Sequence, residues 1–137
     1  MSQENMEVVR RGIEANHSGD LEARTEDLVA LWDPNAEYTS IMAGVDTETY
    51  RGHDGIRRYL RDLAESWKEW RTEVEEVRPV TDNMVVAVVR FHAIGKDSGV
   101  PIDTQLGATF VLSEGKFLRG RMYSTLAEAL EAVGLRE

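Results

Sequence analysis

Apolar residues recur at helical spacing in the first part of this chain. One such pattern predicts an amphipathic helix over residues 3–17, with apolar positions at Met6, Val9 and Ile13. The sequence Ser-Gly-Asp at 18–20 then indicates a stop and a new helix start, with Asp20 as the N-cap.

Two further helices are predicted before the pattern changes. The second carries the apolar positions Leu21, Leu28, Leu31 and Trp32. It ends at residues 33–35, because the residue before Pro34 is pushed out of the helical region. The third, over residues 54–67, is the clearest, with one apolar face formed by Ile56, Tyr59, Leu60, Leu63 and Trp67.

Alternation with a period of two marks the predicted strands. Residues 36–42 alternate in this way, and residues 43–52 are expected to form a loop. From residue 70 onward four strands follow one another through short turns, over residues 70–80, 84–95, 101–112 and 117–124. Residues 126–134 predict a short last helix, with Thr125 and Glu128 as a capping box and Gly134 as the C-cap.

This order of elements predicts one α+β domain over residues 1–137. Consecutive hairpins give an antiparallel sheet, and the helices that precede it are expected to cover one face. A strongly curved sheet of this kind would wrap around the long third helix and leave a central cavity between them.

Composition narrows the classes of partner. The formal charge of −9 argues against nucleic acid and against an anionic membrane surface. No segment is long and apolar enough to span a membrane, and the first residues lack the apolar run of a signal peptide. There is no cysteine, and the three histidines have no metal-ligand spacing. We therefore expect a cytoplasmic protein without a metal or cofactor.

One strand raises a question about function. Residues 85–95 read as a buried strand, yet Arg90 and His92 stand on the same face of it, two residues apart. An unpaired buried charge is costly, so these side chains line a wet cavity, lie in a polar seam between two subunits, or form a structural ion pair, for example with Glu37 or Glu76.

The chain resembles a known superfamily. Several segments are similar to those of the SnoaL-like, or polyketide-cyclase-like, branch of nuclear-transport-factor-2-like proteins. These segments are GDLE (19–22), DP (33–34), YRGHDGIRRYLRDL (50–63), EGK (114–116) and YSTLAEALEAVGL (123–135). The resemblance covers nearly the whole chain and implies a cone-shaped α+β barrel. One departure is residues 21–34, which look about a helical turn longer than the usual second helix.

Three catalytic patterns of this superfamily are incomplete in this chain. Limonene-type epoxide hydrolases carry Arg-x-Asp where this chain has Arg90-Phe91-His92. The aspartate base of ketosteroid isomerases corresponds to Tyr38, which is not a base near neutral pH. The aspartate of SnoaL-type cyclases falls in the region of residues 123–125, which holds no acid.

Two functions from different classes remain. In the first, the protein is a cofactor-independent isomerase, cyclase or hydrolase acting on a small apolar carbonyl substrate. His92 would be the acid or base, Arg90 the oxyanion stabiliser, and Tyr38 or Tyr123 a hydrogen-bond donor. In the second, it is a non-catalytic domain that binds a ligand or dimerises, and His92 is an ordinary core residue.

The remaining candidates concern the cavity lining and the assembly. Expected lining residues are Arg121, Tyr123, Tyr59, Trp67 and Gln105. Arginines that point inward would favour a carboxylate, phenolate or polarised carbonyl, whereas outward ones would form a solvated or dimer-facing row. Ordinary core packing is the alternative for Tyr59 and Trp67. Because both faces of residues 84–95 are largely apolar, and the resemblance points the same way, we expect a homodimer through the outer sheet face.

Overall fold

The computed structural model describes residues 2–43 and 47–135. The helices are α1 (Ser2–Glu14), α2 (Leu21–Val29), α3 (Gly52–Ser66) and α4 (Leu126–Ala132). The strands are β1 (Trp32–Ser40), β2 (Glu48–Arg51), β3 (Trp67–Pro79), β4 (Met84–Gly95), β5 (Pro101–Ser113) and β6 (Lys116–Tyr123). The predicted α+β order of two helices, a strand, a third helix, four successive strands and a short last helix is confirmed, and β2 is an additional strand.

One curved sheet of six strands organises the molecule, in the order β2-β1-β6-β5-β4-β3. Strands β3 to β6 form the predicted succession of antiparallel hairpins. The sheet is mixed rather than wholly antiparallel, because β1 and β6 run parallel. These two strands are separated in the chain by α3 and four further strands, so no hairpin forces them to run in opposite directions.

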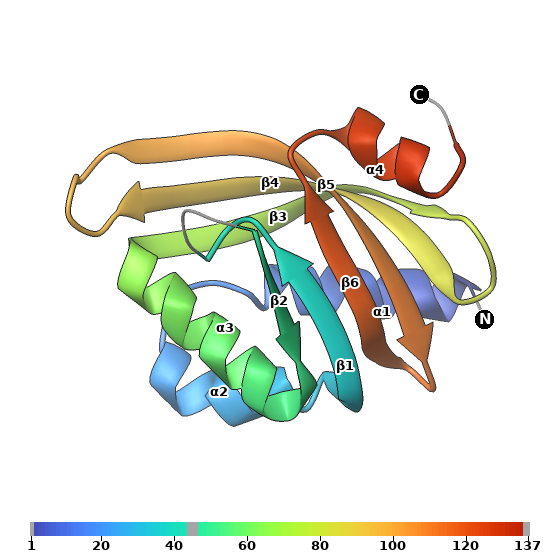
Figure 1. The fold of residues 1–137 in the computed structure, drawn as a ribbon, viewed down its shortest axis with the longest axis horizontal. Helices are drawn as coiled ribbons and strands as arrows, with labels where there is room; N and C mark the ends of the chain where they lie inside the picture. Colours follow the sequence, from blue (N-terminus) through green and yellow to red (C-terminus); the bar gives the residue numbers. More distant parts are fainter. Residues whose placement is uncertain (1, 44–46, 136–137) are drawn as a thin grey trace.

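The two faces of the sheet are covered differently. Helices α1, α2 and α3 lie on the concave side, and α4 lies on the other side near β5 (Figure 1). The main hydrophobic core fills the space between the three N-terminal helices and the concave face. A small second cluster, with Val86, Ala129 and Leu130 at its centre, lies under α4 on the outer face.

Three local predictions need correction. The expected loop at 43–52 contains β2, which pairs with β1 so that Tyr50 lies opposite Tyr38; residues 44–46 lie outside the described part of the chain. Helix α2 ends at Val29, and Trp32 begins β1, so the second helix is about one turn shorter than expected.

The third correction concerns the start of α2. Asp20 has a φ of 49° and makes no side-chain capping hydrogen bond. Its backbone is in the left-handed region, where the chain turns between the two helices, so its carboxylate does not reach the first-turn N–H groups. The Arg24 side chain instead donates to the carbonyl groups of Ala15, His17 and Gly19 and so ties this turn together.

The end of the chain follows the prediction closely. The backbone N–H of Glu128 donates to Thr125 Oγ1 at 3.1 Å, which is the expected N-cap of α4. Gly134 has a φ of 79°, the left-handed conformation typical of a helix C-cap. Helix α4 is thereby fixed over Val86 on the outer face of β4.

Candidate functional site

Strand β4 divides its side chains between the two faces of the sheet. Val89 and Phe91 belong to the core on the concave face, whereas Val86 packs under α4 on the outer face. Because side chains alternate along a strand, Arg90 and His92 share the outer face with Val86. Neither residue lines the central cavity, which corrects the expectation that they do. Their position instead matches the alternative interpretation, in which Arg90 and His92 pair with carboxylates on the outer face.

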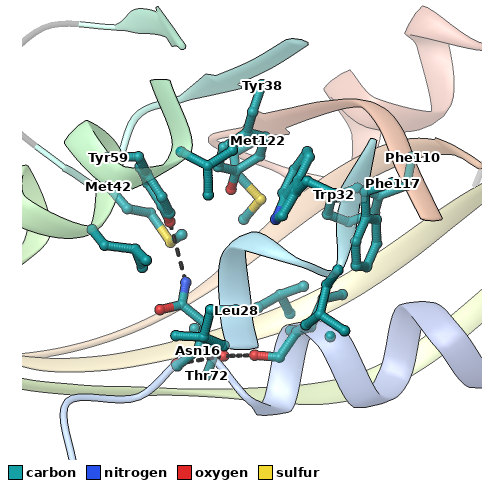
Figure 2. A pocket seen from close by; sticks show the side chains of 16 residues that line it. Asn16, Leu28, Trp32, Tyr38, Met42, Tyr59, Thr72, Phe110, Phe117 and Met122 are labelled. Atoms are coloured by element: carbon teal, nitrogen blue, oxygen red, sulfur yellow. Dashed lines mark hydrogen bonds between the residues drawn. The ribbon is translucent and has the colours of Figure 1, made fainter. Parts of the chain in front are cut away.

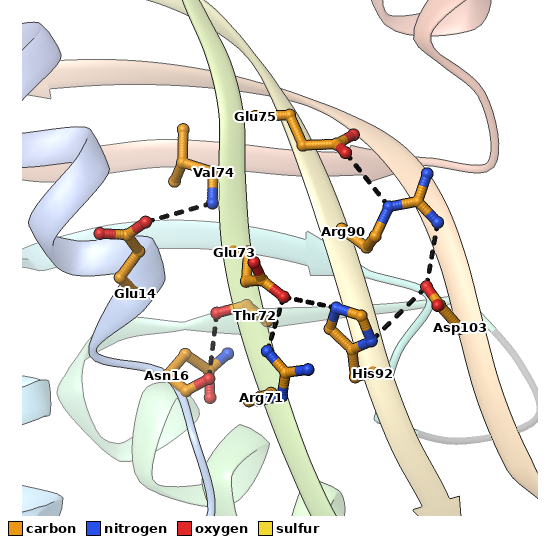
Figure 3. Close-up of polar contacts among 10 residues, drawn as sticks. All are labelled: Glu14, Asn16, Arg71, Thr72, Glu73, Val74, Glu75, Arg90, His92 and Asp103. Carbon is orange, nitrogen blue, oxygen red and sulfur yellow. Dashed lines mark hydrogen bonds and ion pairs between the residues drawn. The ribbon is translucent and has the colours of Figure 1, made fainter.

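Arg90 lies between two carboxylates from the neighbouring strands (Figure 3). Its Nε donates to Glu75 Oε2 at 3.2 Å, and its Nη1 donates to Asp103 Oδ1 at 2.9 Å. The arginine lowers the pKa of Asp103 through this hydrogen bond. The pKa of Glu75 is lowered first by the Gln105 amide, 2.9 Å away, and then by Arg90. Gln105 therefore belongs to this outer-face cluster and not to the cavity.

His92 also lies between two carboxylates. Its Nε2 is 2.6 Å from Glu73 Oε1, at an angle outside that of a hydrogen bond, and its Nδ1 is 3.5 Å from Asp103 Oδ1. The same Glu73 oxygen accepts from Arg71 Nη1 at 2.6 Å. The side chain of His92 is 21% exposed and that of Arg90 33%, so the cluster is half-buried at the surface of one subunit.

The other predicted lining residues are also distributed by strand parity. Arg121 and Tyr123 lie on the outer face of β6, with the Arg121 guanidinium 5.4 Å from the Tyr123 ring centre, because the buried Met122 between them points inward. Tyr123 packs against the α4 cluster. Trp67 is a packing residue at the end of α3: its indole donates to Met42 O at 2.7 Å, and its ring meets Phe91 at 5.5 Å.

A pocket lies on the concave side, between the sheet and the N-terminal helices (Figure 2). Its cavity volume is about 50 Å³, and it contains two of the predicted residues, Tyr38 and Tyr59. Its lining is mostly apolar and aromatic and carries no charged side chain among the residues the structure describes. The lining residues are Gly12, Ile13, Asn16, Leu28, Leu31, Trp32, Tyr38, Met42, Ile56, Tyr59, Leu60, Thr72, Val89, Phe110, Phe117 and Met122.

A short hydrogen-bonded chain forms the polar part of the pocket. Trp70 Nε1 donates to Asn16 Oδ1 at 3.0 Å, and Asn16 Nδ2 donates to the Tyr59 hydroxyl at 3.2 Å. The Tyr38 and Ser40 side chains lie beside the Tyr59 hydroxyl and influence its pKa. The rings of Tyr38 and Tyr59 meet edge to face with centres 4.9 Å apart. The segment after α1, strand β1 and helix α3 thus bring their polar groups close together.

Burial keeps these tyrosines protonated. It raises the pKa of Tyr38 well above the usual value, and the neighbouring Tyr59 raises it further. Burial also raises the pKa of Tyr59, although the Tyr38, Asn16 and Ser40 side chains oppose that shift. Near neutral pH both phenols are therefore neutral hydrogen-bond donors and not bases.

Asn16 and Trp32 are pocket residues that the sequence interpretation did not select. Asn16 had a visible signal, because positions 9, 13 and 16 share one face of the first helix and the third of them is polar. Trp32 was assigned to the apolar face of the second helix. Its role depends on where that helix ends, which is among the least certain features of a sequence pattern.

No helix in the described part of the chain is long and apolar enough to cross a membrane. Across residues 2–43 and 47–135, no group of three histidine or carboxylate side chains is placed to hold a metal ion.

The curved sheet around helices, with a pocket between them, defines the fold of the protein as nuclear-transport-factor-2-like. A structure described as an NTF2-like protein of unknown function, from Burkholderia pseudomallei, has a TM-score of 0.72 and 16% identity, covering 96% of this chain and 98% of its own. A model of the SnoaL-like domain matches residues 9–120, and the chain belongs to that family. No match was found among curated proteins.

Two other similar structures were crystallised with small molecules. A ketosteroid isomerase-like protein from Catenulispora acidiphila, in complex with trimethylamine, has a TM-score of 0.73 and 14% identity, covering 94% of this chain and 93% of its own. A Mycobacterium tuberculosis protein in complex with estradiol-17β-hemisuccinate has a TM-score of 0.66 and 14% identity, covering 91% of this chain and 94% of its own. At this identity the likeness establishes the fold alone.

Proposed function

We propose that the protein binds a small, neutral, largely apolar molecule in the central pocket. The observation that carries this proposal is the lining itself, which is apolar and aromatic with a few converging hydroxyl, amide and indole groups. Similar structures in complex with trimethylamine or a steroid derivative are consistent with small-molecule binding by this fold. The cavity volume of about 50 Å³ favours a ligand of few heavy atoms.

The charge of the ligand follows from the cost of burial. A carboxylate or ammonium group loses its hydration on entering the pocket, and no charged side chain of the described lining compensates that loss. The expectation of a ligand drawn in by inward-pointing arginines is therefore replaced by that of a neutral ligand. Among the two functions considered from the sequence, we favour ligand binding over acid–base catalysis by Arg90 and His92.

A titration with ligands of matched size tests this proposal. Cyclopentanone, cyclopentylammonium and cyclopentanecarboxylate share one ring and differ in charge, and binding can be followed by amide chemical shifts in NMR spectra. We expect only the neutral ketone to bind, with shifts centred on the pocket residues. Equal or tighter binding of either ion would contradict the proposal.

Two variants locate the binding. Leu28 lines the pocket, and Leu28→Trp is expected to fill the cavity and abolish binding of cyclopentanone. His92 lies outside the pocket, and His92→Ala is expected to leave binding unchanged. The reverse pattern would support the enzyme alternative built on His92.

We also propose that the protein forms a homodimer through the outer sheet face. The β3–β5 part of this face carries the carboxylates Glu73, Glu75 and Asp103 around Arg90 and His92. The β6 part carries Arg119 and Arg121, for which no carboxylate lies within ion-pair distance in the described chain. A two-fold axis between these parts would place the arginines of one subunit against the acidic side of the other.

A further inference from the structure

The tryptophans differ in whether the indole N–H group donates a hydrogen bond within the described chain. Trp67 donates to Met42 O, and Trp70 donates to Asn16 Oδ1. The indole N–H of Trp32 meets no acceptor within residues 2–43 and 47–135, and its nitrogen points into the pocket (Figure 2). An N–H group in a mostly apolar pocket gains from any acceptor that a ligand brings.

Trp32 is held firmly in this orientation. Its ring lies 5.0 Å from the ring of Tyr38 and 5.0 Å from that of Phe117, measured between ring centres. Its backbone carbonyl accepts a hydrogen bond from His53 Nε2 at 2.8 Å, which ties the start of β1 to the first turn of α3. The donor is therefore placed before a ligand arrives, and little ordering is needed on binding.

The rest of the polar lining is also arranged to present donors. The Trp70 indole is a donor only, so the Asn16 atom that accepts from it is the amide oxygen, and the amide nitrogen faces Tyr59. The Tyr59 oxygen already accepts from Asn16, and Tyr38 stands beside it as a neutral phenol. A flipped Asn16 would turn its acceptor toward the tyrosines, and Trp70 prevents this.

We propose that the pocket selects a neutral ligand with a carbonyl oxygen, and that the Trp32 indole N–H binds this oxygen beside the Tyr38 hydroxyl. This inference rests on the proposed function and specifies the ligand class of the same site. A carbonyl offers lone pairs and brings no proton that needs an acceptor of its own, whereas an alcohol does. Trp32 is then the residue that sets specificity.

The experiment uses the purified protein with two probes, cyclopentanone and cyclopentane, which share a ring and differ in the oxygen. The indole N–H signals of Trp32, Trp67 and Trp70 are followed by ¹H–¹⁵N NMR. Cyclopentanone is expected to shift the Trp32 signal downfield, while the other two indoles, already bonded, serve as internal references.

Trp32→Phe gives the matched affinity test, because it removes the N–H and keeps an aromatic ring. We expect it to weaken cyclopentanone binding roughly five- to tenfold, the effect of one hydrogen bond, and to leave cyclopentane binding unchanged. Trp67→Phe is the control: Trp67 itself does not line the pocket, and its indole bonds to the backbone carbonyl of Met42 and not to the cavity, so we expect it to change neither affinity.

The possible outcomes separate the two proposals. If both probes bind, but the Trp32 signal does not move downfield and Trp32→Phe weakens both equally, the carbonyl inference is overturned and ligand binding stands. If neither probe binds, the proposed function falls, and the inference with it. Binding of the ketone that depends on Trp32 supports both.

Discussion

Tyr38 illustrates how the environment of one residue sets its chemistry. It lies on the inner face of β1, opposite Tyr50 on β2 and edge to face with Tyr59 on α3. Burial and these neighbours raise its pKa, so the chain has a neutral donor at the position where ketosteroid isomerases carry an aspartate base. The residue suits binding of a neutral ligand and not abstraction of a proton.

The buried tyrosines make stability fall at alkaline pH. Burial raises the pKa of Tyr38 and Tyr59, and burial together with a 2.7 Å hydrogen bond to Asp62 raises that of Tyr50. The unfolded chain releases these protons near pH 10, while the folded chain retains them. The contribution of these tyrosines to the free energy of unfolding is therefore fully present below about pH 10 and is lost as pH rises toward the folded pKa values. The loss amounts to up to about 1.4 kcal/mol per pH unit for each tyrosine.

Urea unfolding between pH 8 and 11, with tyrosinate absorbance recorded in parallel, measures this effect. We expect the absorbance of the buried tyrosines to appear together with unfolding. Tyr50→Phe removes one of the contributing groups, so its stability should decline less steeply than that of the wild type. An identical decline in both proteins would argue against the role of Tyr50.

At the scale of single elements, the short helix α4 depends strongly on its N-terminal cap. The helix spans Leu126–Ala132, too short to be stable alone, and it packs Ala129 and Leu130 against Val86. The Thr125 hydroxyl accepts from the N–H of Glu128 and donates to the carboxylate of the same residue at 3.2 Å. The cap and the packing therefore stabilise the helix together.

Thr125→Ala is expected to lower the free energy of unfolding by about 1 kcal/mol, the usual contribution of a threonine N-cap. Chemical denaturation measures the change. Ser124→Ala is the matched control, because it removes a neighbouring hydroxyl that makes no capping bond to α4. A loss of equal size in the two variants would show that the cap is not the cause.

The whole molecule presents two differently charged halves on its outer face. The ion pairs of Arg90 gather carboxylates over β3 to β5, whereas Arg119 and Arg121 stand on β6. The acidic and basic parts would complement each other if this face met a second copy of itself. A surface for binding another protein would expose a large apolar patch, whereas the exposed large hydrophobic residues among those described are Val100, Ile102 and Leu135.

Sedimentation equilibrium tests the dimer. The wild type is expected at twice the chain mass of 15.5 kDa at micromolar concentration. Arg121→Glu places an acid where the partner's acidic side is expected, and should weaken association at least tenfold. Arg61→Glu, an equal charge change on exposed α3, should leave the mass unchanged. A monomeric wild type would overturn the assembly proposal and leave the pocket unaffected.

Local patterns in the sequence were sufficient for much of this fold. The helical face of residues 54–67, the period of two after residue 70 and the cap at Thr125 are all properties of near neighbours in the chain, and the structure confirms them. Strand parity also correctly placed Arg90 and His92 on one face of β4, and Arg121 and Tyr123 on one face of β6; in the structure both pairs lie on the outer face. Short-range rules specify these features because each depends on residues only two to four positions apart.

Only the tertiary structure decided which face of each strand points to the core and which points outward. Parity does not state whether Arg90 or Phe91 points to the core; that depends on α1, α2 and α3 covering the concave side and α4 covering the other. The parallel pairing of β1 with β6, and the meeting of Asn16, Trp32, Tyr38 and Tyr59 in one pocket, join segments far apart in the chain. Contacts of this range arise from packing the whole molecule, so a local pattern does not contain them.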